Sequence, residues 1–519
     1  MANDLHSTSE YIPTPLTLSS RHATVGTLFH NRVSVNPSHL AVVDGKRKLT
    51  YTELEDRSNR LANGLLDLGI NRGDRVGILA HNCQEYIELK LAAAKAGFIV
   101  AALNCRLGTR ELTHCINLVT PKIIIAQEST LANIGALGTQ AHPQILLGSE
   151  YEELLCASSN EYPNLDIDPE SGLMILYTSG TTGMPKGALI SHRAFIARAM
   201  CFASEMQIPI NDNYCAWPPM YHMASTDQLL ATLLRGGTVH VVDGYNADEI
   251  ITILEQETMQ FMFLIPGMIG DFVKVLQQRK VKVKGLTLCG GMADLVSLDD
   301  IAAASALLNA KYLNSFGATE TGLPPATSSL FDIGERPAKL SKRQSAFCEL
   351  RLVDPEDNDV PNGSPGEAAV RGPTLFSGYW NATAENEACF RNGWFHMGDV
   401  LRRNEDGTLD YVDRVKYMIK SGGENIYPAE IEQVLSMNPR IIESIVVRKK
   451  DDKWGEVPVV FITTNDNTLC PDDILQYCKE HLSRYKQPKE VIFINHSDIP
   501  RSTTGKIQRH ILEDQLVVN

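Results

Sequence analysis

The sequence predicts an α/β protein in which doubly wound sheets form a large N-terminal domain together with a small barrel-like β subdomain. Strand-like apolar segments alternate with helical segments in the first half of the chain, and this alternation is typical of parallel sheets covered by helices. Further on, glycine-containing segments at 366–372 and 378–380 indicate the turns of the β subdomain. After about residue 428 the pattern restarts, which predicts a small α+β C-terminal domain.

Hydrophobic periodicity and capping residues predict the elements of the N-terminal domain. A capping box at Thr52–Glu55 predicts the start of a helix whose leucines, from Leu54 to Leu68, recur at helical spacing. Asn246 predicts the N-cap of a later helix. Short apolar runs predict strands at 75–80, 98–102, 122–126, 173–176 and 238–242.

A charged segment followed by a glycine pair predicts the boundary between the two domains. We place the N-terminal domain at 1–415 and the C-terminal domain at 416–519. In the C-terminal domain the apolar pattern predicts helices at 428–436, 471–483 and 506–515, and strands at 445–447, 457–463 and 491–494.

Charge and cysteine content argue against several classes of protein. The net charge of −14 argues against a nucleic-acid-binding surface, because phosphate backbones need basic patches. Eleven cysteines without a C-x-x-C pair favour reduced thiols over a disulfide scaffold or a zinc site. No signal-peptide pattern is visible, and no apolar run is long enough to span a bilayer, so we expect a cytoplasmic protein without a transmembrane segment.

The segment 177–187 is rich in groups that bind phosphate. Its glycines let backbone N–H groups turn toward an anion, and its hydroxyls and Lys186 add donors and a positive charge. It differs from a Walker A loop, because Pro185 stands where that pattern needs glycine. A flexible surface turn is the alternative, but the density of these groups between two apolar runs favours a polyphosphate-binding loop.

Three further segments carry residues suited to a nucleotide and a metal ion. Phe316 can cover a purine face, Gly317 leaves room beside it, and Glu320 is a hard oxygen ligand suited to Mg²⁺. Asp399 lies in a predicted tight turn, where its carboxylate can accept two hydrogen bonds from a ribose diol. The glycine pair at 290–291 permits the close approach of a flat ligand. The ordinary alternatives are a helix cap, a turn-capping aspartate and a simple turn.

Together these segments resemble the superfamily of acyl- and aryl-CoA synthetases, peptide-synthetase adenylation domains and firefly luciferase. The loop matches the Y-T-S-G-T-T-G-x-P-K-G signature and the following Ser191–His192 pair. The chain departs from the family pattern at Phe316, Met397 and Tyr417, where many members carry tyrosine, threonine and an acidic residue. Four further segments match family motifs in the family's order, at 314–321, 393–399, 413–432 and 500–509.

The resemblance implies a two-domain acyl-CoA synthetase that uses ATP, Mg²⁺ and coenzyme A. In the first step a carboxylate attacks the α-phosphorus of ATP. In the second step a mobile C-terminal domain rotates about the hinge at Lys416, and the acyl group passes to coenzyme A, giving acyl-CoA, AMP and pyrophosphate. Lys506 would bridge the carboxylate and the α-phosphate, where negative charge builds in the transition state. Thr178 and Glu320 would bind Mg²⁺.

The resemblance also assigns the other site residues by their positions in the motifs. His222 belongs to an aromatic-histidine pair whose ring gates carboxylate entry, and with Lys506 and Glu320 it forms the catalytic set. The coenzyme A loop comprises Ser421, Gly422 and Gly423. The acyl pocket comprises His222, Ser225, Gly291, Gly317, Leu323 and Pro324. The ATP-binding residues are Thr178, Ser179, Gly180, Thr181, Thr182, Gly183, Lys186, Gly291, Met292, Ala293, Phe316, Gly317, Ala318, Thr319, Asp399 and Arg414.

The sequence leaves three properties open: the acceptor of the acyl group, the acid that is activated, and the oligomeric state. A carrier-protein pantetheine could replace coenzyme A as acceptor, and an ATP-binding sensor that kept the fold is a non-enzymatic alternative, although such a protein should have lost Lys506 or Glu320. Amino-acid-activating relatives carry aspartate where this chain has His222, but Asp227 lies five residues on. A mostly apolar pocket suits medium-chain, aromatic and alicyclic acids equally well, and a homodimer is one arrangement to test.

Overall fold

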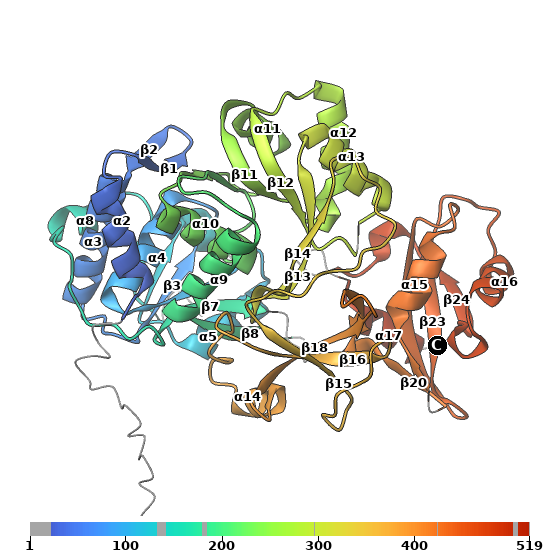
Figure 1. Cartoon of the computed structure of the whole chain (residues 1–519). Coiled ribbons are helices and arrows are strands. Elements are labelled where there is room, and N and C mark those ends of the chain that lie inside the picture. The colour runs from blue at the N-terminus through green and yellow to red at the C-terminus, as the bar shows by residue number, and fades with distance from the viewer. Residues whose placement is uncertain are drawn as a thin grey trace, which may run out of the picture.

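The structure is a computed structural model with a large mixed α/β N-terminal part and a smaller C-terminal part (Figure 1). Sheets flanked by helices and one antiparallel sheet make up the N-terminal part, and the C-terminal part has a sheet of its own. This arrangement confirms the predicted fold class, whereas the exact division at 415/416 stays a prediction. The residues that the structure describes are 22–131, 142–178, 184–294, 296–422, 424–501 and 507–517.

A six-stranded sheet carries the predicted phosphate loop at one edge. Its strand order is β6-β5-β3-β4-β7-β8, and the strands are parallel except for β8, which runs antiparallel to β7. The strands are β3 (Arg75–Leu79), β4 (Ile99–Ala102), β5 (Ile123–Ala126), β6 (Gln144–Leu146), β7 (Gly172–Thr178) and β8 (Lys186–Ser191).

Two four-stranded sheets complete the α/β portion of the N-terminal part. The first has the order β2-β1-β10-β9, with β1 (Leu40–Asp44), β2 (Arg47–Thr50), β9 (Tyr214–Ala216) and β10 (Val239–Val241). The second has the order β11-β12-β13-β14, with β11 (Thr258–Phe263), β12 (Gly285–Gly291), β13 (Lys311–Ala318) and the antiparallel β14 (Gly322–Phe331).

Helices cover these sheets; α3, α5 and α11 bury one face, whereas α4 is buried along its whole length. The N-cap predicted at Asn246 is confirmed, because its side chain accepts a hydrogen bond from the Glu249 backbone N–H. The helices of the N-terminal part are α2 (Val25–Val35), α3 (Tyr51–Asp67), α4 (Gln84–Ala96), α5 (Thr109–Val119), α6 (Glu128–Leu131), α8 (Ser149–Ala157), α9 (His192–Glu205), α10 (Met223–Arg235), α11 (Ala247–Gln256), α12 (Pro266–Arg279) and α13 (Leu298–Leu308).

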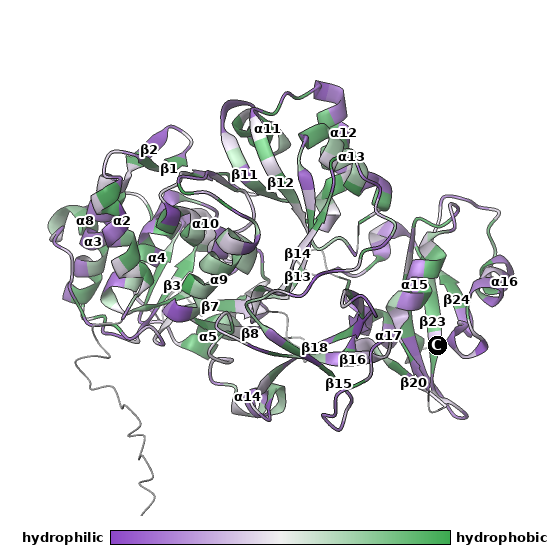
Figure 2. Ribbon diagram, in the orientation of Figure 1, coloured by the Kyte–Doolittle hydropathy of each residue, from purple (hydrophilic) through white to green (hydrophobic). Residues whose placement is uncertain are grey.

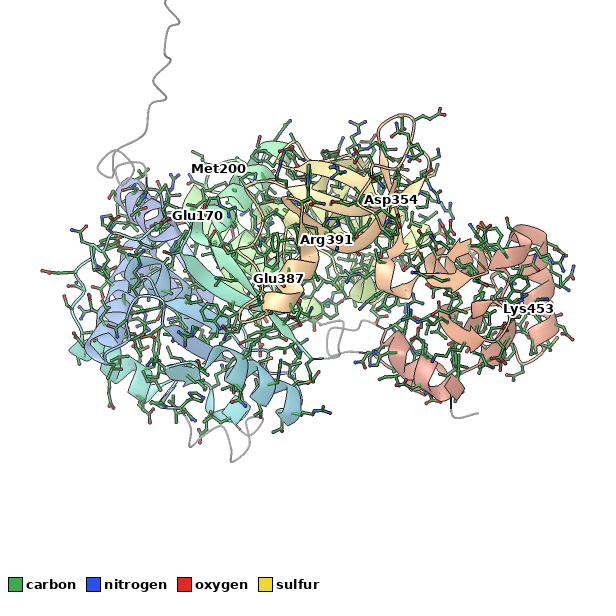
Figure 3. The ribbon with its side chains drawn as sticks, turned by 90° about the horizontal axis from the view of Figure 1, so that it is seen from below. Glu170, Met200, Asp354, Glu387, Arg391 and Lys453 are labelled. Carbon is green, nitrogen blue, oxygen red and sulfur yellow. The ribbon has the colours of Figure 1, made fainter. Side chains whose placement is uncertain are left out.

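The predicted β subdomain is an antiparallel sheet between the α/β sheets and the C-terminal part. In Figure 3, Glu387 and Arg391 mark its region around α14 and β17, and Lys453 marks the C-terminal part beside it. Its elements are β15 (Glu349–Val353), β16 (Pro365–Arg371), α14 (Thr383–Cys389), β17 (Phe390–Arg391), β18 (Trp394–Arg403) and β19 (Leu409–Arg414).

The C-terminal part has an apolar core on each face of its sheet. One core contains Ile431 of α15 and Ile474 of α16, and the other contains Leu512 of α17. Its elements are η1 (Val415–Tyr417), β20 (Ile419–Ser421), β21 (Glu424–Ile426), α15 (Pro428–Ser436), β22 (Glu443–Asp451), β23 (Gly455–Thr463), α16 (Pro471–His481), η2 (Arg484–Lys486), β24 (Glu490–Phe493), η3 (His496–Asp498) and α17 (Arg509–Val517).

Hydropathy follows this layering. Figure 2 shows hydrophobic residues along inner strands such as β3 and β23, and hydrophilic residues on outer elements such as β2. All eleven cysteines are free thiols. None of the helices within the described ranges has the length and apolar character needed to cross a membrane.

Candidate active site

The hairpin of β7 and β8 presents the two ends of the predicted phosphate loop. Thr178, at the end of β7, pairs across the hairpin with Lys186, at the start of β8. The preceding residue, Tyr177, is anchored to α5, because its hydroxyl donates a hydrogen bond to the Cys115 carbonyl at 3.0 Å. The intervening residues Ser179, Gly180, Thr181, Thr182 and Gly183 lie outside the described residues, so their predicted contacts with ATP stay predictions.

A segment of the β subdomain joins this hairpin as an additional edge. Hydrogen bonds link Ser377 N–H to the Leu189 carbonyl (2.8 Å), Leu189 N–H to the Gly378 carbonyl (3.0 Å) and Trp380 N–H to the Gly187 carbonyl (2.7 Å). This pairing brings the ring of Tyr379 next to Lys186, whose Nζ lies 5.2 Å from the ring centroid. A turn of the β subdomain is thereby fixed beside Lys186 and the start of β8.

The same tyrosine contacts the predicted metal ligand, Glu320. The Tyr379 hydroxyl donates a hydrogen bond to Glu320 Oε1 at 2.7 Å, and the backbone N–H of Phe376 donates one to the Glu320 carbonyl at 2.8 Å. Glu320 is 9% exposed. Burial, with a further contribution from the Glu320 charge, raises the pKa of Tyr379, so its hydroxyl keeps its proton and acts as a donor.

A buried arginine supports the backbone around Glu320. Arg198 Nε donates to the Thr374 carbonyl at 2.9 Å, and its Nη2 donates to the Thr319 carbonyl at 3.0 Å. Its Nη1 lies 3.4 Å from Asp227 Oδ1. Asp227 is therefore paired inside the protein, and it is not placed as a free carboxylate for the ammonium group of an amino acid.

Asp399 and Arg414 form an ion pair on neighbouring strands. They are register partners on β18 and β19, and Arg414 Nε lies 2.9 Å from Asp399 Oδ1. The carboxylate of Asp399 is buried, whereas the side chain of Arg414 is 39% exposed. The Asp399 charge is the main cause that raises the pKa of Arg414. The predicted contacts of Asp399 and Arg414 with the nucleotide stay predictions.

The residues predicted for the purine site lie at the ends of β12 and β13. The ring of Phe316 packs against Tyr411, with centroids 5.3 Å apart, and contacts an apolar cluster that includes Met292. Gly317 lies so close to β14 that an added Cβ would stand 2.0 Å from the Gly322 carbonyl oxygen. Ala293 N–H donates to the Asn314 side chain at 3.1 Å. The predicted roles of Gly291, Met292, Ala293, Phe316, Gly317, Ala318 and Thr319 stay predictions.

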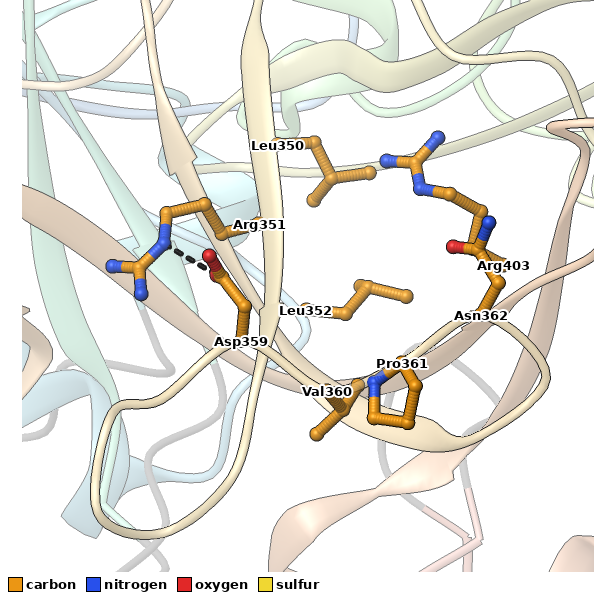
Figure 4. A pocket seen from close by; sticks show the side chains of 8 residues that line it. All are labelled: Leu350, Arg351, Leu352, Asp359, Val360, Pro361, Asn362 and Arg403. Atoms are coloured by element: carbon orange, nitrogen blue, oxygen red, sulfur yellow. Dashed lines mark hydrogen bonds and ion pairs between the residues drawn. The ribbon is translucent and has the colours of Figure 1, made fainter.

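The predicted acyl-pocket residues come from α10, β12, β13 and β14. His222 is the N-cap of α10, and its Nδ1 accepts a hydrogen bond from the Ala224 N–H at 3.3 Å. Ser225 and Leu323 are buried. A surface hollow beside β15 shares none of these residues, since it is lined by Leu350, Arg351, Leu352, Asp359, Val360, Pro361, Asn362 and Arg403 (Figure 4).

The predicted hinge lies where β19 leads into the C-terminal part. Lys416 lies in η1, and its Nζ is 4.8 Å from the centroid of the Tyr417 ring. Burial lowers the pKa of Lys416. Just before it, the buried Asp413 accepts hydrogen bonds from the N–H of Arg414 (2.7 Å) and from the N–H of Ala429 in α15 (2.8 Å). Burial raises the pKa of Asp413 to about 6.

The coenzyme A loop is described in part. Ser421 is buried at the end of β20, and Gly422 follows with a positive φ of 58°. An added Cβ at Gly422 would stand 2.6 Å from a carbon of the Trp454 ring, so glycine is required here by both conformation and space. Gly423 and Lys506 lie outside the described residues, and their roles stay predictions.

The family models match both parts of the chain. The AMP-binding enzyme model matches residues 29–380, and the AMP-binding enzyme C-terminal domain model matches residues 430–506. The chain belongs to the AMP-binding enzyme family. This confirms the family resemblance predicted from the sequence motifs.

Named relatives of this AMP-binding enzyme cover almost its whole length. A feruloyl-CoA synthase of an Amycolatopsis species is 32% identical and aligns over 92% of this chain and 96% of its own. The long-chain-fatty-acid–CoA ligase FadD13 of Mycobacterium tuberculosis is 30% identical, over 95% and 98%. A solved fatty acyl CoA synthetase of Mycobacterium tuberculosis is similar in structure, with a TM-score of 0.78 at 28% identity over 95% and 98% of the two chains.

Proposed function

We propose that this AMP-binding enzyme activates a carboxylic acid with ATP and then transfers the acyl group to coenzyme A. The predicted reaction class, an AMP-forming acid–thiol ligase, is confirmed by relatives named as CoA synthases and ligases. The observation that carries the proposal is the convergence of three sequence segments at the Lys186, Tyr379 and Glu320 contacts. These contacts bring a cation from the phosphate loop and a carboxylate to the same tyrosine.

The adenylation step needs the phosphates, the ribose and the reacting carboxylate held in one place. Lys186 and the loop that precedes it would bind phosphate, while the buried carboxylate of Asp399 would accept hydrogen bonds from the ribose. Arg414 would then lie beside the nucleotide. Lys506 would stabilise the charge that develops on the α-phosphate as pyrophosphate leaves. Holding the reactants in position supplies much of the rate enhancement in such a site.

The residues around Glu320 fit Mg²⁺ bound together with a nucleotide. No three His, Cys, Asp or Glu side chains of the described residues form a metal cage. Mg²⁺ in nucleotide sites usually takes only one or two protein ligands, and phosphates and water supply the others. Glu320 and the Thr178 hydroxyl would hold the ion, which would neutralise phosphate charge when bound.

For the second step, we propose rotation of the C-terminal part about Lys416. This motion would withdraw Lys506 and bring Ser421, Gly422 and Gly423 toward the acyl adenylate. Support comes from the separate apolar cores of the C-terminal sheet and from the glycine conformation required at Gly422. Coenzyme A is the proposed acceptor, and a carrier-protein pantetheine is the alternative that the experiment below distinguishes.

The proposed substrate is an acid without an ammonium group. The support is the pairing of Asp227 with Arg198, since this buried carboxylate already has a cation of the protein beside it. Relatives are named for feruloyl and for long-chain fatty acyl substrates, so we propose an aromatic or aliphatic acid for this enzyme. A cytoplasmic location and a homodimer stay predictions, and light scattering of the purified protein tests the latter.

The test is AMP release with a panel of medium-chain, aromatic and alicyclic acids, each with coenzyme A, with a pantetheine-loaded carrier protein, and with no acceptor. We expect coenzyme A-dependent release with at least one acid. A Glu320→Gln variant controls for contaminating ligases and should lose the activity. Absence of coenzyme A-dependent turnover on every acid would overturn the proposal, and turnover only with the carrier protein would favour the alternative acceptor.

A further inference from the structure

Tyr379 contacts both groups that the proposed function needs near the phosphates. Its hydroxyl donates to Glu320 Oε1, and its ring faces Lys186 Nζ. Within the described residues, the second carboxylate oxygen, Oε2, takes part in no hydrogen bond or ion pair. The tyrosine therefore fixes one oxygen of Glu320 and leaves the other available to a ligand.

The position of Tyr379 is itself fixed by its neighbours. Both of its backbone polar groups bond to Asn386 of α14, because the Tyr379 N–H donates to Asn386 Oδ1 at 2.7 Å and Asn386 Nδ2 donates to the Tyr379 carbonyl at 2.8 Å. Phe376 packs edge-on against the ring, with centroids 4.9 Å apart. Trp380 continues the pairing with β8, and its ring lies 5.4 Å from the Arg75 guanidinium. Because both the backbone and the ring of Tyr379 are held in place, its hydroxyl can hold the Glu320 carboxylate in one orientation.

We infer that Tyr379 is a positioning residue of the adenylation step. Its hydroxyl fixes Oε1 of Glu320 and so leaves Oε2 as the oxygen that would bind Mg²⁺, and its ring contacts Lys186, which would bind the phosphates. The two effects can be tested separately, because the hydroxyl bonds to Glu320 and the ring contacts the Lys186 ammonium. This inference rests on the proposed function, in which Glu320 binds Mg²⁺.

The experiment measures ATP affinity by calorimetry in wild type, Tyr379→Phe and Tyr379→Leu, each with and without Mg²⁺. Tyr379→Phe keeps the ring packing and removes only the hydroxyl. We expect its Kd for ATP to rise about tenfold with Mg²⁺ and to stay at the wild-type value without it. Tyr379→Leu should weaken ATP binding under both conditions, because the ring next to Lys186 is also lost.

Tyr151→Phe is a matched control. The Tyr151 hydroxyl also donates to a glutamate, Glu88 Oε2, at 2.7 Å, and Tyr151 is fully buried, but neither residue belongs to the site. This control should lower the melting temperature without changing the Mg²⁺ dependence of ATP binding. Thioester formation from supplied acyl adenylate should be equal in wild type and Tyr379→Phe, because that step no longer involves the pyrophosphate group.

An unchanged Mg²⁺ dependence in Tyr379→Phe would overturn the inference, and so would an equal change in Tyr151→Phe. These outcomes are distinct from failure of the proposed function. If the wild type activates no acid but binds ATP more tightly with Mg²⁺, and this gain is lost in Tyr379→Phe, then the role of Tyr379 in orienting Glu320 toward metal-bound ATP stands, and the ligase proposal fails.

Discussion

Replacing Arg198 by methionine removes a buried cation while it keeps most of the side-chain volume. The Arg198 side chain is 2% exposed and that of Asp227 is 6% exposed, so the substitution leaves a carboxylate in a nearly dry interior. Loss of one partner of a buried ion pair typically costs about 3–5 kcal/mol. Two carbonyls, those of Thr319 and Thr374, also lose their donor.

A second buried cation reduces this cost. Lys90 is fully buried, donates hydrogen bonds to the Met220 carbonyl and the Thr226 hydroxyl at 2.9 Å, and interacts electrostatically with Asp227. Burial lowers the pKa of Lys90 to about 7. We therefore expect Arg198→Met to lower the free energy of unfolding by about 3 kcal/mol, at the lower end of that range.

A double-mutant cycle with Asp227→Asn separates the ion pair from packing. The asparagine has nearly the same shape and carries no charge, so the double variant should recover at least about 1 kcal/mol relative to the sum of the single variants. Urea denaturation with a constant m-value measures these differences. Strict additivity of the two substitutions would refute the pairing argument, and an Arg198→Met variant as stable as wild type would refute the burial argument.

The other predictions concern the two half-reactions and pH. Lys506→Ala should slow adenylate formation about a hundredfold or more and spare thioester formation from supplied acyl adenylate, whereas equal loss of both steps would refute separate roles. Gly422→Val, which would collide with Trp454, should do the reverse, with thioester formation slowed about a hundredfold in single-turnover assays; unimpaired thioester formation would count against the proposed coenzyme A path. Burial lowers the pKa of His192 to about 4. The contribution of neutral His192 to the free energy of unfolding should therefore be fully present above about pH 6.5, and the free energy of unfolding should fall by about 3 kcal/mol as the pH drops toward 4. His192→Asn, which keeps an acceptor for the Val25 N–H, should flatten this pH dependence in denaturation curves, and an unchanged slope would contradict it.

Local sequence signals predict local structure well. The helix predicted at 428–436 is α15, and Asn246 caps α11 as expected. The capping box predicted at Thr52–Glu55 was wrong, because the helix begins two residues earlier with Thr50 and Glu53 as the reciprocal pair. Both pairs have the same spacing, and the apolar period fits either start, so only the backbone hydrogen bonds distinguish them.

Long-range pairing is the part of the site that the sequence could not reveal. Tyr379 was visible only as part of a turn, and its partner Glu320 lies 59 positions away. No sequence motif marks Arg198 as a site residue. Its pairing with Asp227 shows that this aspartate is an internal ion-pair partner and not a free carboxylate for a substrate ammonium group. Such contacts depend on how separate sheets pack, which periodicity within one segment does not encode.

The bond between Asp413 and α15 sets a bias on the proposed domain rotation. Asp413 precedes the hinge at Lys416 and Ala429 follows it, so rotation about the hinge would separate the carboxylate from the helix N-terminus that it caps. A charge-assisted hydrogen bond of this kind contributes roughly 1–3 kcal/mol, equivalent to a ratio of about 5 to 150 between the orientation seen here and one without the bond. In the proposed rotation, the orientation of the C-terminal part would then be set by an equilibrium, and the carboxylate of Asp413, three residues before Lys416, would favour the orientation seen here.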